Sequence, residues 1–267
     1  MNSQEKEYYN RHLKLPSVQI EGQLLLKKAR VLVVGAGGLG SPVLLYLAGA
    51  GVGTIGIIDY DVVELSNLHR QVLFTMEDIG KSKALQAKEN VCRLNPFINC
   101  VAYNEKLTDS NIFDLFKDYD IIVDCTDNFP ARYLIDDACF LMQKTNVYAS
   151  IYQYEGQVSV FNFQGKGTPS PNYRDLYPSP PPTALTPNCN ESGVIGILHG
   201  IIGALQGAEV IKLITNIGDP LVGKLLVFNM LSMDSTIIKF SVSTTRTMVK
   251  GLIDYEEFCN IDPVRKQ

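Results

Sequence analysis

A glycine-rich segment, GAGGLG at residues 35–40, constrains the fold of this chain more than any other feature. It follows the apolar run ARVLVV, which is typical of a short buried strand, and it opens SPVLLYLAGAG, which has the composition of a helix. Glycines let the backbone turn tightly and approach a ligand, while the N–H groups at the start of the helix attract phosphate. The pattern predicts a site for a nucleotide with a ribose, formed in part by Gly35, Gly37, Gly38 and Gly40.

The same order of strand and helix recurs as far as about residue 150. Strand-like apolar runs alternate with stretches of helical periodicity, which predicts parallel strands joined by right-handed crossovers. We expect an α/β fold with a Rossmann-like, doubly wound, mostly parallel sheet. Residues 6–29 are expected to be helical with a break at Pro16, and the expected strands are ARVLVV, TIGIIDYD, part of NPFINCVAYNEKL, DIIVDCTDN and TNVYAS.

The pattern changes after residue 155. EGQVSVFNF and KLLVFNMLSMDSTIIKFSV alternate more strictly and predict antiparallel strands that continue the sheet. Between them lies a loop at 165–188 that is rich in proline and glycine, and loops of that length usually have a function or are mobile. Because no linker is obvious, we expect one domain over 1–267, with the nucleotide-binding part at about 1–150 and the remainder at 151–267.

Composition excludes some classes of protein. A formal net charge of −4 offers no overall field that would attract nucleic acid or an anionic membrane. The six cysteines form no C-x-x-C pair, and the first residues contain no apolar signal region, which together favour a reducing cytoplasm. The apolar stretch 193–214 is nearly long enough to span a membrane, but polar residues interrupt it, so we expect a buried helix or a subunit interface.

Polar residues after the second expected strand suit a charged ligand. Asp59 ends that strand, where a carboxylate can accept hydrogen bonds from ribose hydroxyls, but this does not separate NAD from ATP. Cations close behind it could neutralise a longer polyphosphate. Lys81 is better explained as an exposed residue at a helix start, although cations there oppose the helix dipole, so at least one lysine should have an anionic partner. The residues concerned are Asn67, Arg70, Gln71, Lys81 and Lys83.

A second polar group, Asp124, Asp127 and Asn128, follows the fourth expected strand. Ligands of open α/β sheets lie beyond the carboxyl ends of the strands, and a carboxylate there could hold Mg²⁺. Asp127 could instead cap the following helix. A Rossmann dehydrogenase also remains open from these residues, although His12, His69 and His199 form no clear catalytic group.

Several stretches taken together resemble the MoeB/ThiF/HesA family, bacterial relatives of ubiquitin-activating enzymes. The resemblance extends from about Tyr9 to Cys259. It implies an adenylyltransferase that uses ATP and Mg²⁺ to activate the C-terminal Gly-Gly carboxylate of a ubiquitin-like sulfur-carrier protein as an acyl-adenylate, with release of pyrophosphate. The stretches that carry it are VLVVGAGGLGSPVLLYLAGAGVGTIGIIDYDVVELSNLHRQVLF, IGKSKA, DCTDNFPARYLI, EGQVSVF and PNCNESGVIGILHGIIGALQGAEVIK.

The resemblance also implies roles for individual residues. The glycine turn and Asp59 would hold the nucleotide, with Asp59 on the ribose, and we also expect Asp61, Gln71 and Asn128 at the nucleotide site. The triphosphate would be gripped by Asn67, Arg70 and Lys83, and Asp127 would be linked to Mg²⁺. Arg11 would reach into the ATP site of a second subunit, which implies a homodimer.

Cys189 aligns with a cysteine that links covalently to the carrier in some family members. A position near a helix N-terminus would make its thiol a better nucleophile. The alternative is an ordinary loop or buried cysteine.

One departure from the family is clear. Members typically bind a structural zinc ion through two C-x-x-C pairs, but here Asn172 and Asp175 stand where the first pair is expected, and the second pair is missing. Because a closed zinc site needs about four ligands, we expect no zinc. Three other functions stay open: adenylation of a peptide carboxylate, adenylation of a modified tRNA, and an inactive scaffold.

Overall fold

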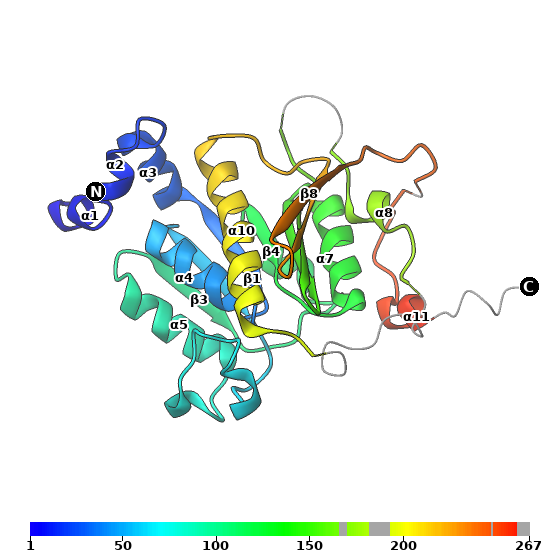
Figure 1. Ribbon diagram of the computed structural model, residues 1–267, viewed down its shortest axis with the longest axis horizontal. Helices are drawn as coiled ribbons and strands as arrows, with labels where there is room; N and C mark the ends of the chain where they lie inside the picture. Colours follow the sequence, from blue (N-terminus) through cyan, green and yellow to red (C-terminus); the bar gives the residue numbers. More distant parts are fainter. Residues whose placement is uncertain (166–169, 182–192, 247, 261–267) are drawn as a thin grey trace, which may run out of the picture.

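The computed structural model describes residues 1–165, 170–181, 193–246 and 248–260, and one eight-stranded sheet runs through both halves of the chain (Figure 1). The strand order is β3-β2-β1-β4-β5-β6-β7-β8. The first five strands in this order are parallel, and the last three continue the sheet in antiparallel fashion. The expected fold class is confirmed. The strands are β1 (Arg30–Val34), β2 (Thr54–Ile58), β3 (Asn99–Tyr103), β4 (Ile121–Asp124), β5 (Thr145–Tyr152), β6 (Glu155–Phe161), β7 (Lys224–Asn229) and β8 (Asp234–Lys239).

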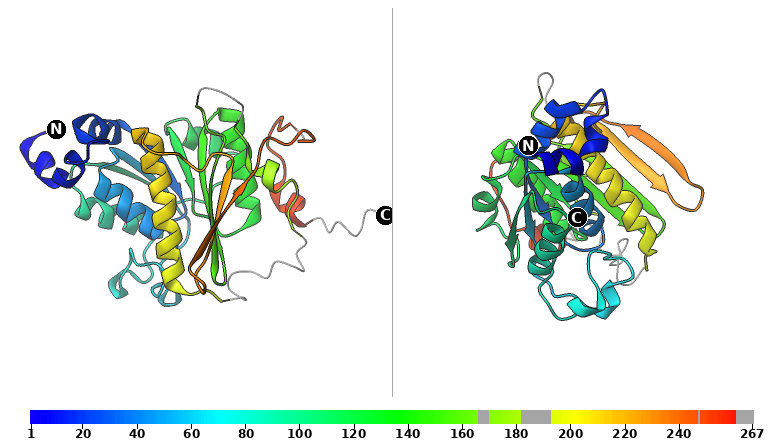
Figure 2. Two further views of the ribbon diagram at one scale, coloured as in Figure 1. Left: turned by 45° about the horizontal axis from the view of Figure 1, so that its top comes forward. Right: turned by 90° about the vertical axis from the view of Figure 1, so that its left-hand side faces the viewer.

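Helices cover both faces of the sheet (Figure 1 and Figure 2). One apolar core joins the sheet to α3, α4, α5 and α10, and a second core joins the other face to α6, α7 and α11. Burial on both faces explains why the parallel strands are continuously apolar in sequence. The helices are α1 (Ser3–Tyr8), α2 (Asn10–Leu13), α3 (Gln19–Lys28), α4 (Gly40–Ala50), α5 (Lys83–Leu94), α6 (Ile112–Phe116), α7 (Phe129–Met142), α8 (Tyr173–Leu176), α10 (Gly196–Thr215) and α11 (Tyr255–Asn260).

The N-terminal region is helical but divided. The expected break at Pro16 is present, since α2 ends at Leu13 and α3 begins at Gln19. A further break at Tyr9 separates α1 from α2. Tyr9 is buried, and its hydroxyl accepts a hydrogen bond of 2.7 Å from Asn95 Nδ2, so its anchoring to the core coincides with the bend.

The apolar segment near residue 200 forms α10, which packs along β5, β6 and α4. By length and composition it could cross a membrane, but 44% of its most apolar window is buried inside the protein. Two of its polar residues have internal partners: Gln206 Nε2 donates to the carbonyl oxygens of Asp124 and Val147, at 2.7 and 2.9 Å, and Glu209 accepts from Leu221 N at 2.8 Å. These contacts account for the polar interruptions that argued for a core helix.

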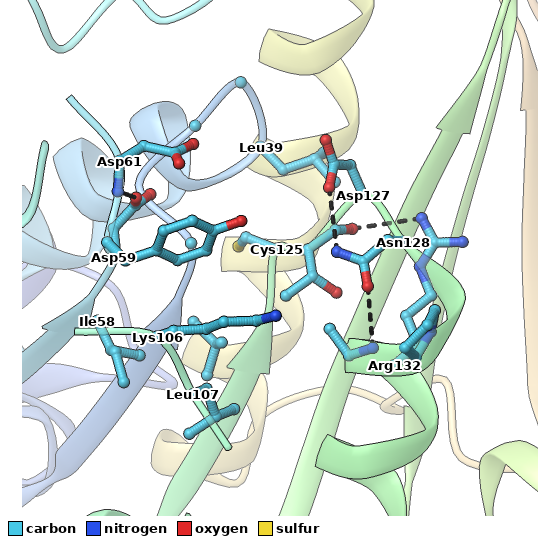
Figure 3. A pocket seen from close by; sticks show the side chains of 18 of the residues that line it. Leu39, Ile58, Asp59, Asp61, Lys106, Leu107, Cys125, Asp127, Asn128 and Arg132 are labelled. Atoms are coloured by element: carbon cyan, nitrogen blue, oxygen red, sulfur yellow. Dashed lines mark hydrogen bonds between the residues drawn. The ribbon is translucent and has the colours of Figure 1, made fainter. Parts of the chain in front are cut away.

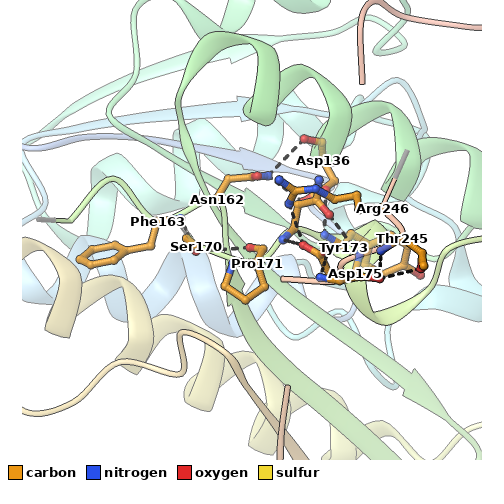
Figure 4. A network of polar contacts seen from close by, with 11 residues as sticks. Asp136, Asn162, Phe163, Ser170, Pro171, Tyr173, Asp175, Thr245 and Arg246 are labelled. Atoms are coloured by element: carbon orange, nitrogen blue, oxygen red, sulfur yellow. Dashed lines mark hydrogen bonds and ion pairs between the residues drawn. The ribbon is translucent and has the colours of Figure 1, made fainter. Parts of the chain in front are cut away.

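A buried carboxylate, Asp136 on α7, ties three parts of the chain together (Figure 4). It accepts hydrogen bonds from Asn162 Nδ2 at 2.9 Å, Asn146 Nδ2 at 3.2 Å and the backbone N–H of Tyr173 at 2.8 Å. Burial raises the pKa of Asp136 to about 7, although these donors favour the ionised form.

This raised pKa predicts a pH-dependent stability. The folded state binds the proton of Asp136 more tightly than the unfolded state, so the stabilisation is complete at about pH 4 and is lost as the pH rises towards 7. Relative to Asp136→Asn, the free energy of unfolding of the wild type should fall over this range by up to about 1.4 kcal/mol per pH unit. Urea unfolding of both proteins at several pH values measures the difference, and parallel pH profiles would contradict the assignment.

Candidate nucleotide-binding site

A cavity of about 1030 Å³ lies at the carboxyl ends of β1, β2 and β4 (Figure 3). The sheet register creates it: Val34 at the end of β1 pairs with both Ile58 and Asp124, so the residues that follow all three strands meet at one edge. In open α/β sheets this is where ligands bind. Of the predicted site residues, the cavity is lined by Gly35, Gly37, Gly38, Asp59, Asp61, Arg70, Gln71, Lys83, Asp127 and Asn128.

The glycine turn has two kinds of glycine. Gly35 has a φ of 94°, and a Cβ there would lie 3.0 Å from the carbonyl oxygen of Cys125. Gly40 does not line the cavity: a Cβ at Gly40 would lie 2.0 Å from the carbonyl oxygen of Gly35. The structure therefore places Gly40 beneath the turn, where it permits close packing, and not beside the ligand space as the sequence suggested.

The carboxylate of Asp59 is hydrogen-bonded to the backbone of the glycine turn. Its Oδ2 accepts from the backbone N–H of Ala36 at 2.8 Å, and its Oδ1 accepts from that of Asp61 at 2.9 Å. Burial raises the pKa of Asp59, while these hydrogen bonds oppose that change. The carboxylate is thus held in a fixed orientation at the edge of the cavity.

Lys83 begins α5, and its side chain is buried, with 7% exposed. Its Nζ lies 2.9 Å from Asp61 Oδ2, which supplies the anionic partner that its place at a helix N-terminus requires. Lys81 is different, because its side chain is 51% exposed, is paired with Asp78 and does not line the cavity. The two lysines therefore differ as the sequence suggested: Lys83 lines the cavity, and Lys81 is an exposed residue outside it.

The short 3-10 helix η1 (Leu65–Asn67) ends in Asn67 and precedes Arg70, and it gives these two predicted residues different directions. Arg70 lines the cavity, and its Nη1 donates to the carbonyl oxygen of Ser66 at 2.9 Å. Asn67 does not line the cavity: it is buried, and its Oδ1 accepts from the backbone N–H of Glu64 at 3.4 Å. The structure brings Arg70, but not the Asn67 side chain, to the predicted site.

Asp127 and Asn128 have separate roles at the start of α7. Asn128 is the helix cap, since its Oδ1 accepts from the backbone N–H of Ala131 at 3.0 Å. Asp127 contacts only Asn128 Nδ2, at 3.4 Å, among the hydrogen bonds of the described residues (Figure 3). Its exposed carboxylate faces the cavity, so capping does not account for it.

The carboxylate of Asp127 is better suited to binding magnesium than to binding a metal that is coordinated by protein side chains alone. No group of three or more His, Cys, Asp or Glu residues that could hold a metal occurs in the described ranges. Mg²⁺ usually takes one or two carboxylates and completes its shell with substrate phosphates and water. Asp127 is therefore chemically suited to hold Mg²⁺ together with a bound polyphosphate.

Two further predicted residues lie elsewhere. Arg11 is exposed on α2 and does not line this cavity, so its role in a second subunit stays a prediction. Cys189 lies outside the described residues.

Several residues that line the cavity were missed from sequence, among them Arg132 and His199. Arg132, one turn into α7, is buried, and its Nε makes no hydrogen bond to the described part of the chain. Its place in DCTDNFPARYLI, four residues and so one helical turn beyond Asn128, was an available signal. His199 on α10 packs against the glycine turn, where a Cβ at Gly38 would lie 2.2 Å from its ring. Burial and the nearby charge of Arg70 lower the pKa of His199 to about 4, which leaves the imidazole neutral at pH 7.

Comparison with known proteins connects this geometry to a family. The chain matches the ThiF family over residues 9–248. It belongs to that family. The predicted recognition is confirmed by this match and by the sequence relatives.

The relatives of this ThiF-family chain are named as adenylyltransferases. It is 48% identical over 261 residues to the probable adenylyltransferase/sulfurtransferase MoeZ of Mycobacterium tuberculosis, covering 98% of this chain and 67% of MoeZ. It is 46% identical to the sulfur carrier protein adenylyltransferase of Thermus thermophilus, covering 97% of this chain and 98% of that protein. Among solved structures, E. coli MccB with MccA-N7isoASN has a TM-score of 0.79 at 22% identity, covering 97% of this chain and 76% of MccB, which shows a shared fold.

Proposed function

We propose that this chain uses ATP to adenylate the C-terminal glycine carboxylate of a ubiquitin-like sulfur carrier and releases pyrophosphate. The observation that carries the proposal is the match at 46% identity to a sulfur carrier protein adenylyltransferase over almost the full length of both chains. The arrangement of the cavity supports the same reaction, because cations face the glycine turn on which phosphates would bind.

The geometry suggests how ATP would lie. We assign the phosphates to the turn at Gly37 and Gly38 and the ribose to Asp59, which the backbone holds in place. Arg70, Lys83 and Arg132 would then surround the phosphates from the turn after η1, from α5 and from α7. A dinucleotide would leave these additional cations without a role, so the arrangement favours ATP over NAD.

Lys83 would change partners on binding. Its ammonium group is paired with Asp61, which is half exposed. A polyphosphate carries more charge than one carboxylate and can attract the same ammonium group, so the ion pair keeps Lys83 oriented until the ligand arrives.

The reaction requires positioning and charge stabilisation more than proton transfer. The carboxylate of the carrier is already ionised at neutral pH, so no general base is needed for attack on the α-phosphorus. Arg70 and Lys83 would stabilise the charge that develops on the departing pyrophosphate. Asp127 would hold Mg²⁺, which when bound supplies additional positive charge at the phosphates.

Assembly and substrate choice complete the proposal. A homodimer in which Arg11 contributes to the partner's site is supported by the exposure of Arg11 and by its place outside the lining of its own cavity. A peptide carboxylate is the second candidate substrate, since MccB with AMPCPP and MccA shares the fold at 25% identity and a TM-score of 0.72, over 85% of this chain and 68% of MccB. The higher identity to the carrier-activating relative favours the carrier.

Carrier-dependent ATP–pyrophosphate exchange tests the proposal. With a panel of ubiquitin-like proteins ending in Gly-Gly, exchange should require one of them, and Asp127→Ala should reduce it by roughly 100-fold because the metal loses its protein ligand. Asp114→Ala is the matched control, since Asp114 is an exposed carboxylate on α6 paired with Lys117. Exchange that is independent of every carrier, or equal losses in both variants, would contradict the proposal.

A further inference from the structure

A buried ion pair joins two segments that are far apart in sequence (Figure 4). Asp175 lies on α8, after the strand β6, and Arg246 lies after the strand β8. Arg246 Nη1 is 2.8 Å from Asp175 Oδ2, and the two side chains are 10% and 0% exposed. Two charges so deeply buried are costly unless each is fully satisfied, so their remaining contacts decide whether the pair is stabilising.

The carboxylate of Asp175 is fully satisfied. Its Oδ1 accepts from the backbone N–H of Ser243 at 2.8 Å, and its Oδ2 also accepts from that of Asn172 at 2.8 Å. Asn172 Oδ1 accepts in return from the backbone N–H of Asp175 at 3.1 Å, which closes a capping box. The guanidinium of Arg246 lies over the ring of Phe140 on α7, 5.3 Å from its centroid. We call this set, Asp175 with Arg246, Ser243 and Asn172, the 175–246 clamp.

The clamp occupies the place where the family resemblance implies zinc. Asn172 and Asp175 stand at the positions of the first expected cysteine pair, and Ser243 and Arg246 lie in the region from which the second pair is missing. These residues do not fit the metal. Zinc prefers four sulfur, nitrogen or carboxylate donors, whereas here the only carboxylate is saturated by N–H donors and a guanidinium cation lies beside it.

We propose that the 175–246 clamp is the cross-link that holds α8 to the segment after β8 in this protein, in place of a metal ion, so that this link needs neither zinc nor cysteine ligands. A zinc ion joins two segments by coordinating side chains from both, and the clamp joins two segments by charge and hydrogen bonds. Its contacts run from α8 to backbone and side-chain groups at residues 243 and 246.

The clamp also supports the wall of the nucleotide cavity. Next to Asp175, Arg174 forms a bidentate pair with Asp137 of α7, at 2.7 and 2.8 Å. Asp137 Oδ2 in turn accepts from the hydroxyl of Tyr255, at 2.9 Å, and Tyr255 on α11 lines the cavity. By fixing α8, the clamp thus contributes to the position of α11.

Thermal unfolding of the full chain tests the clamp through a double-mutant cycle. Arg246→Met leaves a buried carboxylate without its cation, and Asp175→Asn leaves a buried guanidinium without its anion. Each should lower the midpoint temperature by roughly 10 °C, and the double variant should lower it by clearly less than the sum of the two. Asp114→Asn, which breaks an exposed pair, is the control and should shift the midpoint by roughly 1 °C or less.

Metal dependence is measured on the wild-type protein. Incubation with EDTA should leave the midpoint temperature unchanged, and elemental analysis should find no stoichiometric zinc. An EDTA-induced loss of stability with one zinc per chain, or additive effects in the cycle, would overturn the proposal. If Arg246→Met does not fold, Arg246→Lys, which keeps the charge, should still fold. An Arg246→Lys variant that is no more stable than Arg246→Met would also overturn the proposal. None of these measurements depends on the proposed adenylation.

Discussion

Replacing Lys83 with methionine should lower the rate of carrier-dependent ATP–pyrophosphate exchange by at least roughly 100-fold. Lys83 is a buried cation of the cavity, held in place by Asp61 at 2.9 Å, and its side chain is only 7% exposed. In such an environment a charge interacts more strongly with a developing anion than it would in water. Steady-state exchange measured at saturating carrier, with the folded state checked by circular dichroism, gives the effect.

Lys81→Met is the matched control, because the two lysines are only two positions apart and undergo the same chemical change. Lys81 is half exposed, paired with Asp78, and absent from the cavity lining. Its replacement should change the exchange rate by less than about twofold, as expected for an exposed charge in high dielectric. Similar losses in both variants would show that the phosphates do not lie where the cavity geometry indicates.

Gly40→Ala should lower the exchange rate almost as much as Lys83→Met, but for a steric reason. A Cβ at this position would meet the backbone oxygen of Gly35 at 2.0 Å, and no side-chain movement can relieve that contact. The turn must open, which should destabilise the fold by about 2–3 kcal/mol. It should also displace the N–H groups to which we assign the phosphates, and displacements of that kind can cost roughly 100-fold in rate. Urea unfolding and the exchange assay measure the two effects separately.

Gly49→Ala, in the same helix, should have the opposite effect on stability. Nothing lies within 4 Å of a Cβ at Gly49, so the new methyl group meets no steric obstacle. Alanine is a better helix former than glycine, which should stabilise the fold by up to about 1 kcal/mol without reducing exchange. Equal destabilisation by both substitutions would contradict the assigned packing of the glycine turn.

Much of the fold followed from local sequence patterns because those patterns reflect burial. ARVLVV and DIIVDC contain β1 and β4, which apart from Arg30 are buried on both faces, and such strands are largely apolar. The position of the site followed as well, since parallel strands bring their carboxyl ends together and polar residues mark those ends at Asp59 and Asp127.

Other features depended on tertiary packing, which sequence spacing does not contain. Asn67 and Arg70 are neighbours in sequence, but the 3-10 turn at 65–67 directs only Arg70 to the cavity. His199 reaches the glycine turn because α10 crosses α4 closely, with Gly203 against Pro42. The Asp175–Arg246 pair joins residues 71 positions apart, and neither has an individual signal that identifies the other.

Mass spectrometry of the carrier tests the central claim most directly. A ubiquitin-like carrier ending in Gly-Gly, incubated with this chain, ATP and Mg²⁺ and quenched in acid, should gain the mass of one adenylyl group at its C-terminal glycine. The product should be absent with a carrier that lacks the last glycine, and it should form at least roughly 100-fold more slowly with Lys83→Met. A chain that binds ATP but leaves every such carrier unmodified, while adenylating a different carboxylate, would contradict the account.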